Sequence, residues 1–472
     1  MRVTRSLRVP VPAADLFAWH ERPGAFERLS PPWQRVRVVR TDGRITDGAR
    51  VELDVRVAPA LLSALDPLVD LVVPARWVVE HRDHVPGRQF RDEQLEGPFA
   101  YWTHLHRVEP DGPAASVLTD DVELALPFGV PGALVGGALA RAELARLFRH
   151  RHAVTANDLA RHAAAAAPPM TVAVTGASGM IGSTLVPFLT TGGHTVVRIG
   201  RGAPQPSATP QLRDVQWDPA AGRLDPDALE GVDAVVHLAG ASVADRWTPA
   251  HRRAIEDSRV RGTALLAETL ARMERRPRTL VCASAIGYYG DRGNELLDET
   301  SAPGHGFLPE VAQRWEAAAA PAERAGVRVV RLRFGIVLSP RGGALPRLML
   351  PFQLGAGGHI GDGTQWMSVV ALDDVIGALH FALVHDALRG PVNVVTPEPV
   401  TNDEFAHTLG RVLHRPAIVP APAFAVRLAL GRQQADEMVL VSQRVVPRAL
   451  LDAGFVFQHP TVEEALRFEL GK

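Results

Sequence analysis

Three regularly spaced glycines, Gly176, Gly179 and Gly182, lie near the middle of this chain of 472 residues. An apolar run (172–174) precedes them, and a segment with apolar residues at helical spacing follows. Where a strand enters a helix through such a turn, backbone amides can approach a pyrophosphate and the helix dipole favours that anion. The sequence therefore predicts a dinucleotide site, with an ordinary strand-to-helix turn as the alternative. The contacts expected from the turn are Gly176, Ser178, Gly179, Met180, Ile181 and Gly182.

The charges after the next strand indicate which dinucleotide is bound. NAD sites usually place Asp or Glu about 20 residues beyond the glycines, to hold the ribose 2′-hydroxyl. Here that strand ends HTVVRIGRG, which supplies Arg198 and Arg201 and no acid. Guanidinium groups match a 2′-phosphate, so we expect NADP(H) rather than NAD. Asp218, in VQWDP, either contacts the adenine amino group or initiates a turn before Pro219.

Two further strand ends carry residues suited to this chemistry. The segment VVHLAGA ends in Leu238, Ala239 and Gly240, where a ribose or nicotinamide can pass, and we expect all three to contact the cofactor. The segment SAIGYYGDRG places Ser284 and Tyr288 at the end of another strand. A hydroxyl that polarises a carbonyl and a phenol that moves a proton are the groups expected beside a nicotinamide.

Alternating strands and helices must position these residues from Met170 onwards. Parallel βαβ units stacked in this way form a doubly wound (Rossmann) sheet of the α/β class, with its ligand crevice at the carboxyl ends of the strands. The apolar runs expected as strands are 172–174, 195–199, 234–238, 279–282 and 327–332, and the helical segments are 248–272 and 307–325.

A different pattern occupies the first third of the chain. Strand-like runs cover 51–57, 76–80, 88–95, 100–109 and 115–126, and a long helical segment follows them. This order predicts an α+β domain in which a curved antiparallel sheet grips one helix. Trp102, His104 and His106 share one strand face, where they can line a pocket or bind metal. No carboxylate or cysteine is spaced along the chain to complete their set, so we expect no metal site.

The segment RHAAAAAPP separates the two patterns and marks a domain boundary. We expect a helix-grip domain at 1–162, a dinucleotide-binding domain at 170–419 and a small, mainly helical C-terminal cap at 420–472 on the substrate side.

Composition excludes several classes of protein. A net charge of −1 gives no electrostatic basis for binding nucleic acid. The single cysteine, Cys282, cannot form an internal disulfide and fits a reducing compartment, so a cytoplasmic location is expected. No uncharged run reaches the roughly 20 residues that span a bilayer.

The motifs of residues 170–472, in this order and spacing, resemble the extended short-chain dehydrogenase/reductases, the NAD(P)-dependent epimerase/dehydratase family. WTPAHRRAIEDSRVRGT, IGYYGDRG, PFQLGAGGHIGDGTQW and GPVNVVTPEPVTNDEFA are similar to an epimerase-like subgroup with a C-terminal extension. The stretch GRQFRDEQLEGPFAYWTHLHRVEP resembles the START-like helix-grip (SRPBCC) superfamily, whose members usually enclose a cavity for lipids or polyketides. That resemblance implies a hydrophobic ligand for the first domain; a filled core is the alternative.

The resemblance fails at the usual catalytic pair. These enzymes normally move a proton with Tyr-x-x-x-Lys, in which the lysine helps to lower a tyrosine pKa of about 10. The only lysine here is the terminal Lys472, and no tyrosine follows Tyr289. If Glu316 is the acid that follows the motif by eight residues, Leu308 and Ala312 stand in the Tyr and Lys places.

The remaining catalytic candidates are Ser284, Tyr288 as the preferred proton donor, and Arg259, which stands where many relatives place a structural Asn. Arg333, on the strand after the altered helix, is assigned to the cofactor or to a carbonyl oxygen. The segment GAGGHIGDGTQW is expected as a lid or as a surface loop. The candidate substrate contacts are Tyr289, His359, Gln365 and Trp366.

These features predict an NADP(H)-dependent oxidoreductase or epimerase-like enzyme acting on a small or hydrophobic carbonyl or hydroxyl compound. The alternative is a catalytically silent NADP(H)-binding sensor or hydrophobic-ligand carrier, which the missing Tyr-x-x-x-Lys pair favours.

Overall fold

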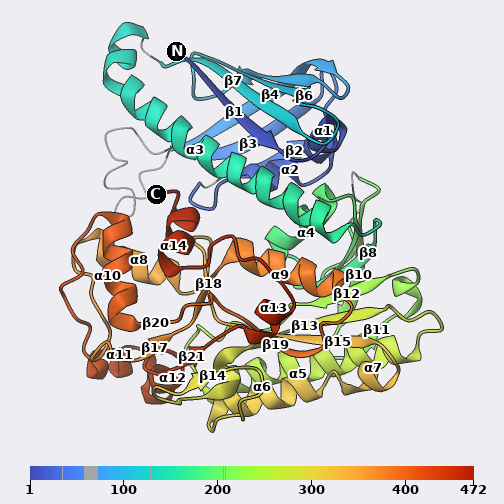
Figure 1. Cartoon of the computed structure of the whole chain (residues 1–472), viewed down its shortest axis with the longest axis vertical. Helices are drawn as coiled ribbons and strands as arrows, with labels where there is room; N and C mark the ends of the chain where they lie inside the picture. The colour runs from blue at the N-terminus through green and yellow to red at the C-terminus, as the bar shows by residue number, and fades with distance from the viewer. Residues whose placement is uncertain (35, 58–72, 128, 206, 208) are drawn as a thin grey trace. The chain divides into compact units, whose positions relative to one another are not determined.

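The computed structural model describes the chain except for residues 35, 58–72, 128, 206 and 208. It divides into two compact units (Figure 1). The first comprises Met1–Ala166 with Pro187–Gly193 and Gly471. The second comprises Ala167–Val186, His194–Leu470 and Lys472. Within the described ranges, no helix has both the length and the apolar character needed to cross a membrane.

The first unit is an antiparallel sheet with one long helix. Its strand order is β1-β7-β6-β5-β4-β3-β2, and α3 follows the last strand (Figure 1). Buried side chains alternate along β7, as they must when one sheet face packs on a core. The α+β helix-grip prediction is confirmed. The elements are β1 (Arg2–Val9), α1 (Ala13–Glu21), α2 (Ala25–Leu29), β2 (Val36–Thr41), β3 (Arg50–Val57), β4 (Val73–Val85), β5 (Gln89–Glu96), β6 (Tyr101–Pro110), β7 (Ser116–Ala125) and α3 (Gly129–Ala165).

The second unit contains an eight-stranded sheet in the order β11-β10-β9-β8-β12-β13-β15-β19. All pairings are parallel except that of β10 with the short β11. Strand order reverses between β8 and β12, which places a ligand crevice at the carboxyl ends of these two strands. The Rossmann prediction is confirmed. The strands are β8 (Thr171–Thr175), β9 (Thr195–Gly200), β10 (Leu212–Asp218), β11 (Arg223–Leu224), β12 (Ala234–His237), β13 (Thr279–Ala285), β15 (Arg328–Phe334) and β19 (Gly390–Val394).

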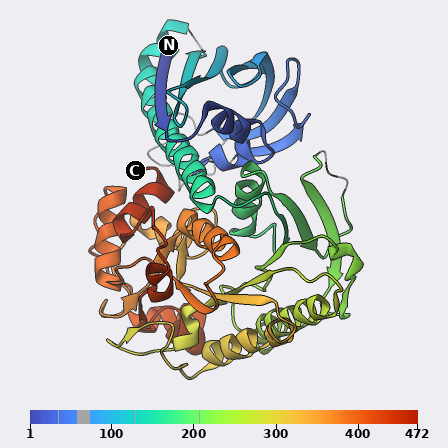
Figure 2. The ribbon, with the colours of Figure 1, turned by 45° about the vertical axis from the view of Figure 1, so that its right-hand side comes forward.

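Helices cover both faces of this sheet, which is why its central strands are apolar throughout. Helices α5, α6 and α7 lie on one face and α9 on the other (Figures 1 and 2). The remaining helical elements up to residue 413 are η2 (Asp227–Leu229) and η3 (Ile286–Tyr289), then α4 (Gly182–Thr191), α5 (Pro249–Arg272), α6 (Phe307–Ala317), α7 (Ala320–Arg324), α8 (Leu345–Gln353), α9 (Leu372–Val384) and α10 (Asn402–Leu413).

Three short two-stranded sheets accompany the main sheet among the described residues of this unit. The pairs are β14 (Leu296–Leu297) with β21 (Arg444–Val445), β16 (Ile336–Leu338) with β18 (Val369–Ala371), and β17 (Trp366–Met367) with β20 (Val400–Thr401). The C-terminal helices are α11 (Ala423–Leu430), α12 (Arg432–Met438), α13 (Arg448–Asp452) and α14 (Val462–Leu470).

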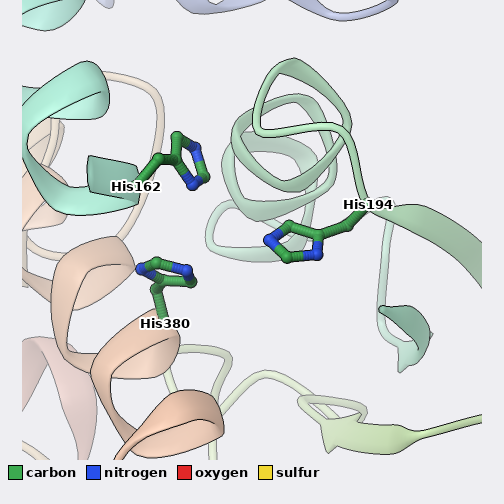
Figure 3. Close-up of side chains that lie close together, drawn as sticks. All are labelled: His162, His194 and His380. Atoms are coloured by element: carbon green, nitrogen blue, oxygen red, sulfur yellow. The ribbon is translucent and has the colours of Figure 1, made fainter. Parts of the chain in front are cut away.

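A buried imidazole helps to join the start of the sheet to α9. His194, in the turn before β9, accepts a hydrogen bond at Nδ1 from the amide of Met170 at 3.0 Å. Its ring centroid lies 6.0 Å from that of His380 on α9 (Figure 3). Polar groups therefore meet at the amino-terminal end of β8, opposite to the crevice.

Candidate dinucleotide site

The glycine turn is packed too closely for side chains. Gly176 follows β8 with φ +68°, a conformation that favours glycine. A Cβ on Gly176 would stand 2.9 Å from the amide nitrogen of Ala239, and one on Gly182 would stand 2.2 Å from the carbonyl oxygen of Gly176. The amide of Gly179 closes the turn by donating to the Gly176 carbonyl at 3.0 Å. These glycines hold the start of α4 against the ends of β8 and β12, where a pyrophosphate would approach backbone amides.

The last residue of β8 aligns the two strands at the crevice. Thr175 Oγ1 accepts hydrogen bonds from the amides of Leu238 and Ala239, at 3.1 and 3.2 Å. It also lies 2.7 Å from Nδ1 of His237, whose pKa burial lowers to about 4. A neutral imidazole and a threonine hydroxyl therefore fix the loop that carries Leu238, Ala239 and Gly240. Sequence reasoning did not identify Thr175, although it immediately precedes the glycines.

Arg259 supports the same loop. Its Nη1 donates to the carbonyl of Ala241 at 2.9 Å and to that of Ile255 at 3.2 Å. Its guanidinium carbon lies 5.0 Å from the Trp315 ring centroid. Burial lowers the pKa of Arg259 to about 10. Through these contacts Arg259 supports the β12 loop, and its catalytic role stays a prediction.

The two arginines after β9 differ in their surroundings. Arg198 donates from Nε to Oδ1 of Asp214 at 2.7 Å, and Asp214 lies directly across from it on β10. Arg201 is exposed and forms no ion pair with any residue that the structure describes. Of the two predicted 2′-phosphate contacts, Arg201 therefore has the freer guanidinium. Asp214 is a partner that sequence spacing did not reveal.

Asp218 is placed by a turn. Its Oδ1 accepts hydrogen bonds from the amides of Ala220 and Ala221, both at 3.1 Å, and its Oδ2 lies 3.1 Å from a guanidinium nitrogen of Arg223. The hydrogen bonds from Ala221 and Arg223 lower the pKa of Asp218. The turn interpretation accounts for these contacts, and a contact of Asp218 with adenine stays a prediction.

A buried polar network lies at the ends of β13, β15 and β19. Ser284, Arg333 and Asn393 are directly opposite one another across these strands. Glu316, on α6, accepts from Ser284 Oγ at 2.7 Å and from Nε of Arg333 at 2.8 Å. Ser284 is only 2% exposed, and its hydroxyl proton points to Glu316. That Ser284 polarises a substrate carbonyl stays a prediction.

The two adjacent tyrosines have different environments. Tyr289 has no exposed surface, and its hydroxyl donates to Asn393 at 2.7 Å while accepting from Arg333 at 3.0 Å. Burial raises the pKa of Tyr289 to about 12. The phenol is enclosed in this network, and the contact of Tyr289 with substrate stays a prediction. Tyr288 is partly exposed, with the guanidinium carbon of Arg333 3.5 Å from its ring centroid. Arg333 thus stacks on Tyr288 and binds Glu316, rather than standing free for a cofactor.

Leu308 and Ala312 lie in the first turns of α6, and Ala312 is buried. The Leu308 amide donates to Oε2 of Glu437 at 2.8 Å. The Cβ of Leu308 lies 3.6 Å from the position that a Cβ on Gly287 would take. Helix α6 therefore approaches the segment that carries Tyr288. At this approach it presents an aliphatic side chain instead of a phenol.

The segment 355–366 is held at several points. The amide of Ile360 donates to Asn402 Oδ1 at 2.6 Å, and Gln365 Nε2 donates to the carbonyl of Ile360 at 3.0 Å. Trp366 donates from its indole to Asn294 Oδ1 at 3.0 Å. His359 Nδ1 is buried with no hydrogen-bond partner among the described residues. Gln365 and Trp366 thus serve the loop itself, whereas His359 keeps a free nitrogen. The structure does not bring these three residues into contact with Tyr288.

Comparison with known proteins agrees with this architecture. Residues 172–395 match the NAD dependent epimerase/dehydratase family, residues 9–148 match a family described as polyketide cyclase/dehydrase and lipid transport, and residues 421–469 match a domain of unknown function. An epimerase family protein of Mycobacterium bovis is 44% identical over 298 residues, which cover 63% of this chain and 96% of that protein.

Two solved structures are similar. A nucleoside-diphosphate sugar epimerase from Corynebacterium glutamicum has a TM-score of 0.79 and 32% identity, covering 99% of this chain and 90% of that one. The human epimerase family protein SDR39U1, solved with NADPH, has a TM-score of 0.57 and 33% identity, covering 63% of this chain and 98% of that one.

The second unit thus has a Rossmann fold with a closely packed glycine turn. The chain belongs to the epimerase family, with a second matched family at its N-terminal end.

Proposed function

We propose that the second unit binds NADP(H) at the carboxyl ends of β8 and β12 and catalyses reduction, oxidation or epimerisation of a small or hydrophobic carbonyl or hydroxyl compound. The observation that carries this proposal is the Gly176–Gly182 turn, in which a Cβ on Gly182 would stand 2.2 Å from the Gly176 carbonyl oxygen. Because no side chain fits at these glycines, the backbone amides of the turn stay accessible to a pyrophosphate. The human relative solved with NADPH supports the choice of cofactor.

Each part of the site has a role in this proposal. The turn binds the pyrophosphate, and Arg201 binds the 2′-phosphate, with Arg198 held beside it by Asp214. The loop 238–240, fixed by Thr175 and Arg259, borders the ribose and nicotinamide. When bound, the cofactor supplies or accepts hydride.

Tyr288 is the proton donor or acceptor in this proposal. It is the tyrosine that retains exposed surface in the network, and the Arg333 guanidinium against its ring favours developing negative charge. Arg333 is itself held by two hydrogen bonds to Glu316, both at 2.8 Å. The Glu316–Arg333 pair therefore positions Tyr288, in place of a lysine on α6.

A second candidate function is a silent NADP(H) sensor. Leu308 and Ala312 on α6 and the Ser284–Glu316 hydrogen bond favour it, because they remove the usual proton relay. For the first unit, we propose a hydrophobic ligand, which the match of residues 9–148 to a lipid-transport family supports.

Turnover separates the two candidates. NADPH oxidation is followed by absorbance with aldehydes, ketones, quinones and nucleoside-diphosphate sugars, the last chosen because of the C. glutamicum relative. The enzyme proposal predicts NADPH oxidation, NADP⁺ reduction or an epimerised product with at least one class, and a loss of roughly 10²-fold or more in the rate of Tyr288→Phe. Tyr101→Phe, an exposed tyrosine in the first unit, is the matched control and should retain full rate. The sensor requires tight NADPH binding together with no NADPH oxidation, no NADP⁺ reduction and no epimerised product, because epimerisation returns the cofactor to its starting state.

A further inference from the structure

Strand register in the first unit assembles histidines and carboxylates on one face of the sheet. His81 on β4, Asp92 on β5 and His104 on β6 are directly opposite one another. His106, two residues beyond His104 and hence on the same face, is opposite Asp120 on β7. The carboxylates missing from the sequence argument therefore come from neighbouring strands, which spacing along one strand does not reveal.

The side chains of this group contact one another. Asp120 Oδ1 lies 3.0 Å from His104 Nε2 and 2.8 Å from His106 Nδ1. The other oxygen of Asp120 lies 2.8 Å from His152 Nε2, which comes from α3. Asp92 Oδ1 lies 2.6 Å from His81 Nδ1, whereas its Oδ2 lies 3.6 Å from His106 Nε2. That last separation is too long for a hydrogen bond and close to the spacing of two ligands on one small cation.

We propose that Asp92, His104 and His106 bind a divalent first-row transition metal. One ligand atom from each of the three residues lies within 4.8 Å of the others. Two imidazoles and a carboxylate suit Zn²⁺ or Fe²⁺, and three protein ligands leave a position for water or a ligand. His104 and His106 are 2% and 6% exposed, while Asp92 is partly exposed.

Outer partners for the three ligands are already in place. Metal-bound histidines usually donate their second ring nitrogen to a carboxylate, which fixes the orientation of the ring. Asp120 occupies that position for His104, and His81 supports Asp92. Asp120 also lies 2.8 Å from His106 Nδ1, although that nitrogen has no hydrogen-bond partner among the described residues. A ring used only for packing would not need such a partner on each side.

Charge favours a cation at this place. Asp120 is a buried carboxylate and Asp92 a partly exposed one, and the Arg151 guanidinium interacts with both. If its imidazoles are neutral, the cluster of two carboxylates and one guanidinium therefore carries a net negative charge. Either a proton on one imidazole or a metal ion compensates it, and these two states can be distinguished by experiment.

The test uses the full chain after removal of metals by chelation. Titration with Co²⁺ should give the visible absorption bands of a site with nitrogen and oxygen ligands. Zn²⁺ should displace Co²⁺, so that the bands disappear, and should raise the melting temperature. Asp92→Asn should weaken binding at this site by more than about 100-fold, because loss of an outer partner alone costs about 10–100-fold. His84→Gln is the matched control, since His84 pairs with Glu21 outside the cluster.

Far-UV circular dichroism establishes that each variant is folded. Asp120→Asn, which keeps all three ligands, should give an intermediate affinity. Absence of visible bands with the unaltered chain would overturn the proposal, as would equal Co²⁺ affinity in the folded Asp92→Asn variant. Either result would identify the cluster as a protonated hydrogen-bond network.

Discussion

Arg333 binds Glu316 through two parallel hydrogen bonds, from Nε to Oε1 and from Nη2 to Oε2, each 2.8 Å long. Arg333 is 2% exposed, and the face of its guanidinium lies on Tyr288. The pair joins α6 to β15 beneath the residue that we assign to proton transfer. A planar guanidinium can make both contacts at once, which an ammonium group cannot.

Removing one partner of this pair should strongly destabilise the protein. In Glu316→Gln the buried guanidinium loses its countercharge, and we expect the free energy of unfolding to fall by about 3–5 kcal/mol. Urea denaturation followed by circular dichroism measures the change. Glu463→Gln, which breaks an exposed pair with Arg411, is the control and should lose far less. Equal losses in both variants would contradict the role given to Glu316.

Gly182→Ala tests the packing of the turn. The added Cβ would stand 2.2 Å from the Gly176 carbonyl oxygen, so the turn must open and the amides must leave the phosphate position. We expect loss of NADPH binding, measured by nucleotide fluorescence. Gly137→Ala, at a helical position with no atom closer than 3.8 Å, is the control and should bind normally. Unchanged affinity in Gly182→Ala would exclude the turn from the site.

Arg201→Ala tests recognition of the 2′-phosphate. A hydrogen bond to a charged group contributes about 1.5–3 kcal/mol, so NADPH affinity should fall about tenfold to a hundredfold. NADH affinity should hardly change, because NADH lacks that phosphate. Arg223→Ala, which removes the guanidinium beside Asp218, is the control and should retain the preference for NADPH. An equal decrease for both nucleotides would assign Arg201 to another part of the cofactor.

Stability should depend on pH through Glu469. Burial, followed by repulsion from Asp373, raises the pKa of this carboxyl from 4.5 to about 8. The folded state therefore binds a proton that the unfolded state releases, and stability present below pH 4.5 is lost as pH rises toward 8. The loss approaches about 1.4 kcal/mol per pH unit at its steepest.

Glu469→Gln cannot ionise but still accepts the hydrogen bond from the Leu372 amide. Denaturant titrations between pH 5 and 9 should show a flatter profile for this variant than for the unaltered chain. Glu310→Gln, an exposed position on α6, should leave the profile unchanged. Parallel profiles for Glu469→Gln and the unaltered chain would contradict the raised pKa.

The sequence predicted the elements of both units well because their apolar patterns are local. The runs at 172–174 and 234–238 became β8 and β12, and the run at 100–109 became β6. The roles of individual polar residues were less predictable, because they depend on partners distant in the chain. Ser284 donates its hydroxyl proton to Glu316, which lies 32 residues later.

The same reason explains the contacts of the other polar residues. Arg259 is engaged by the carbonyls at Ala241 and Ile255, contacts that depend on how α5 packs rather than on residue type. Asp92 and Asp120 reach His106 only through strand register. Spacing along the chain identified which groups can do chemistry, and tertiary packing decided which of them are free to do it.

Calorimetric titration of the intact chain with NADPH and with NADH tests the central claim most directly. A single site per chain that binds NADPH more tightly than NADH is the predicted result. If neither nucleotide gave a heat of binding or competed with the other, the assignment of the glycine turn would be contradicted.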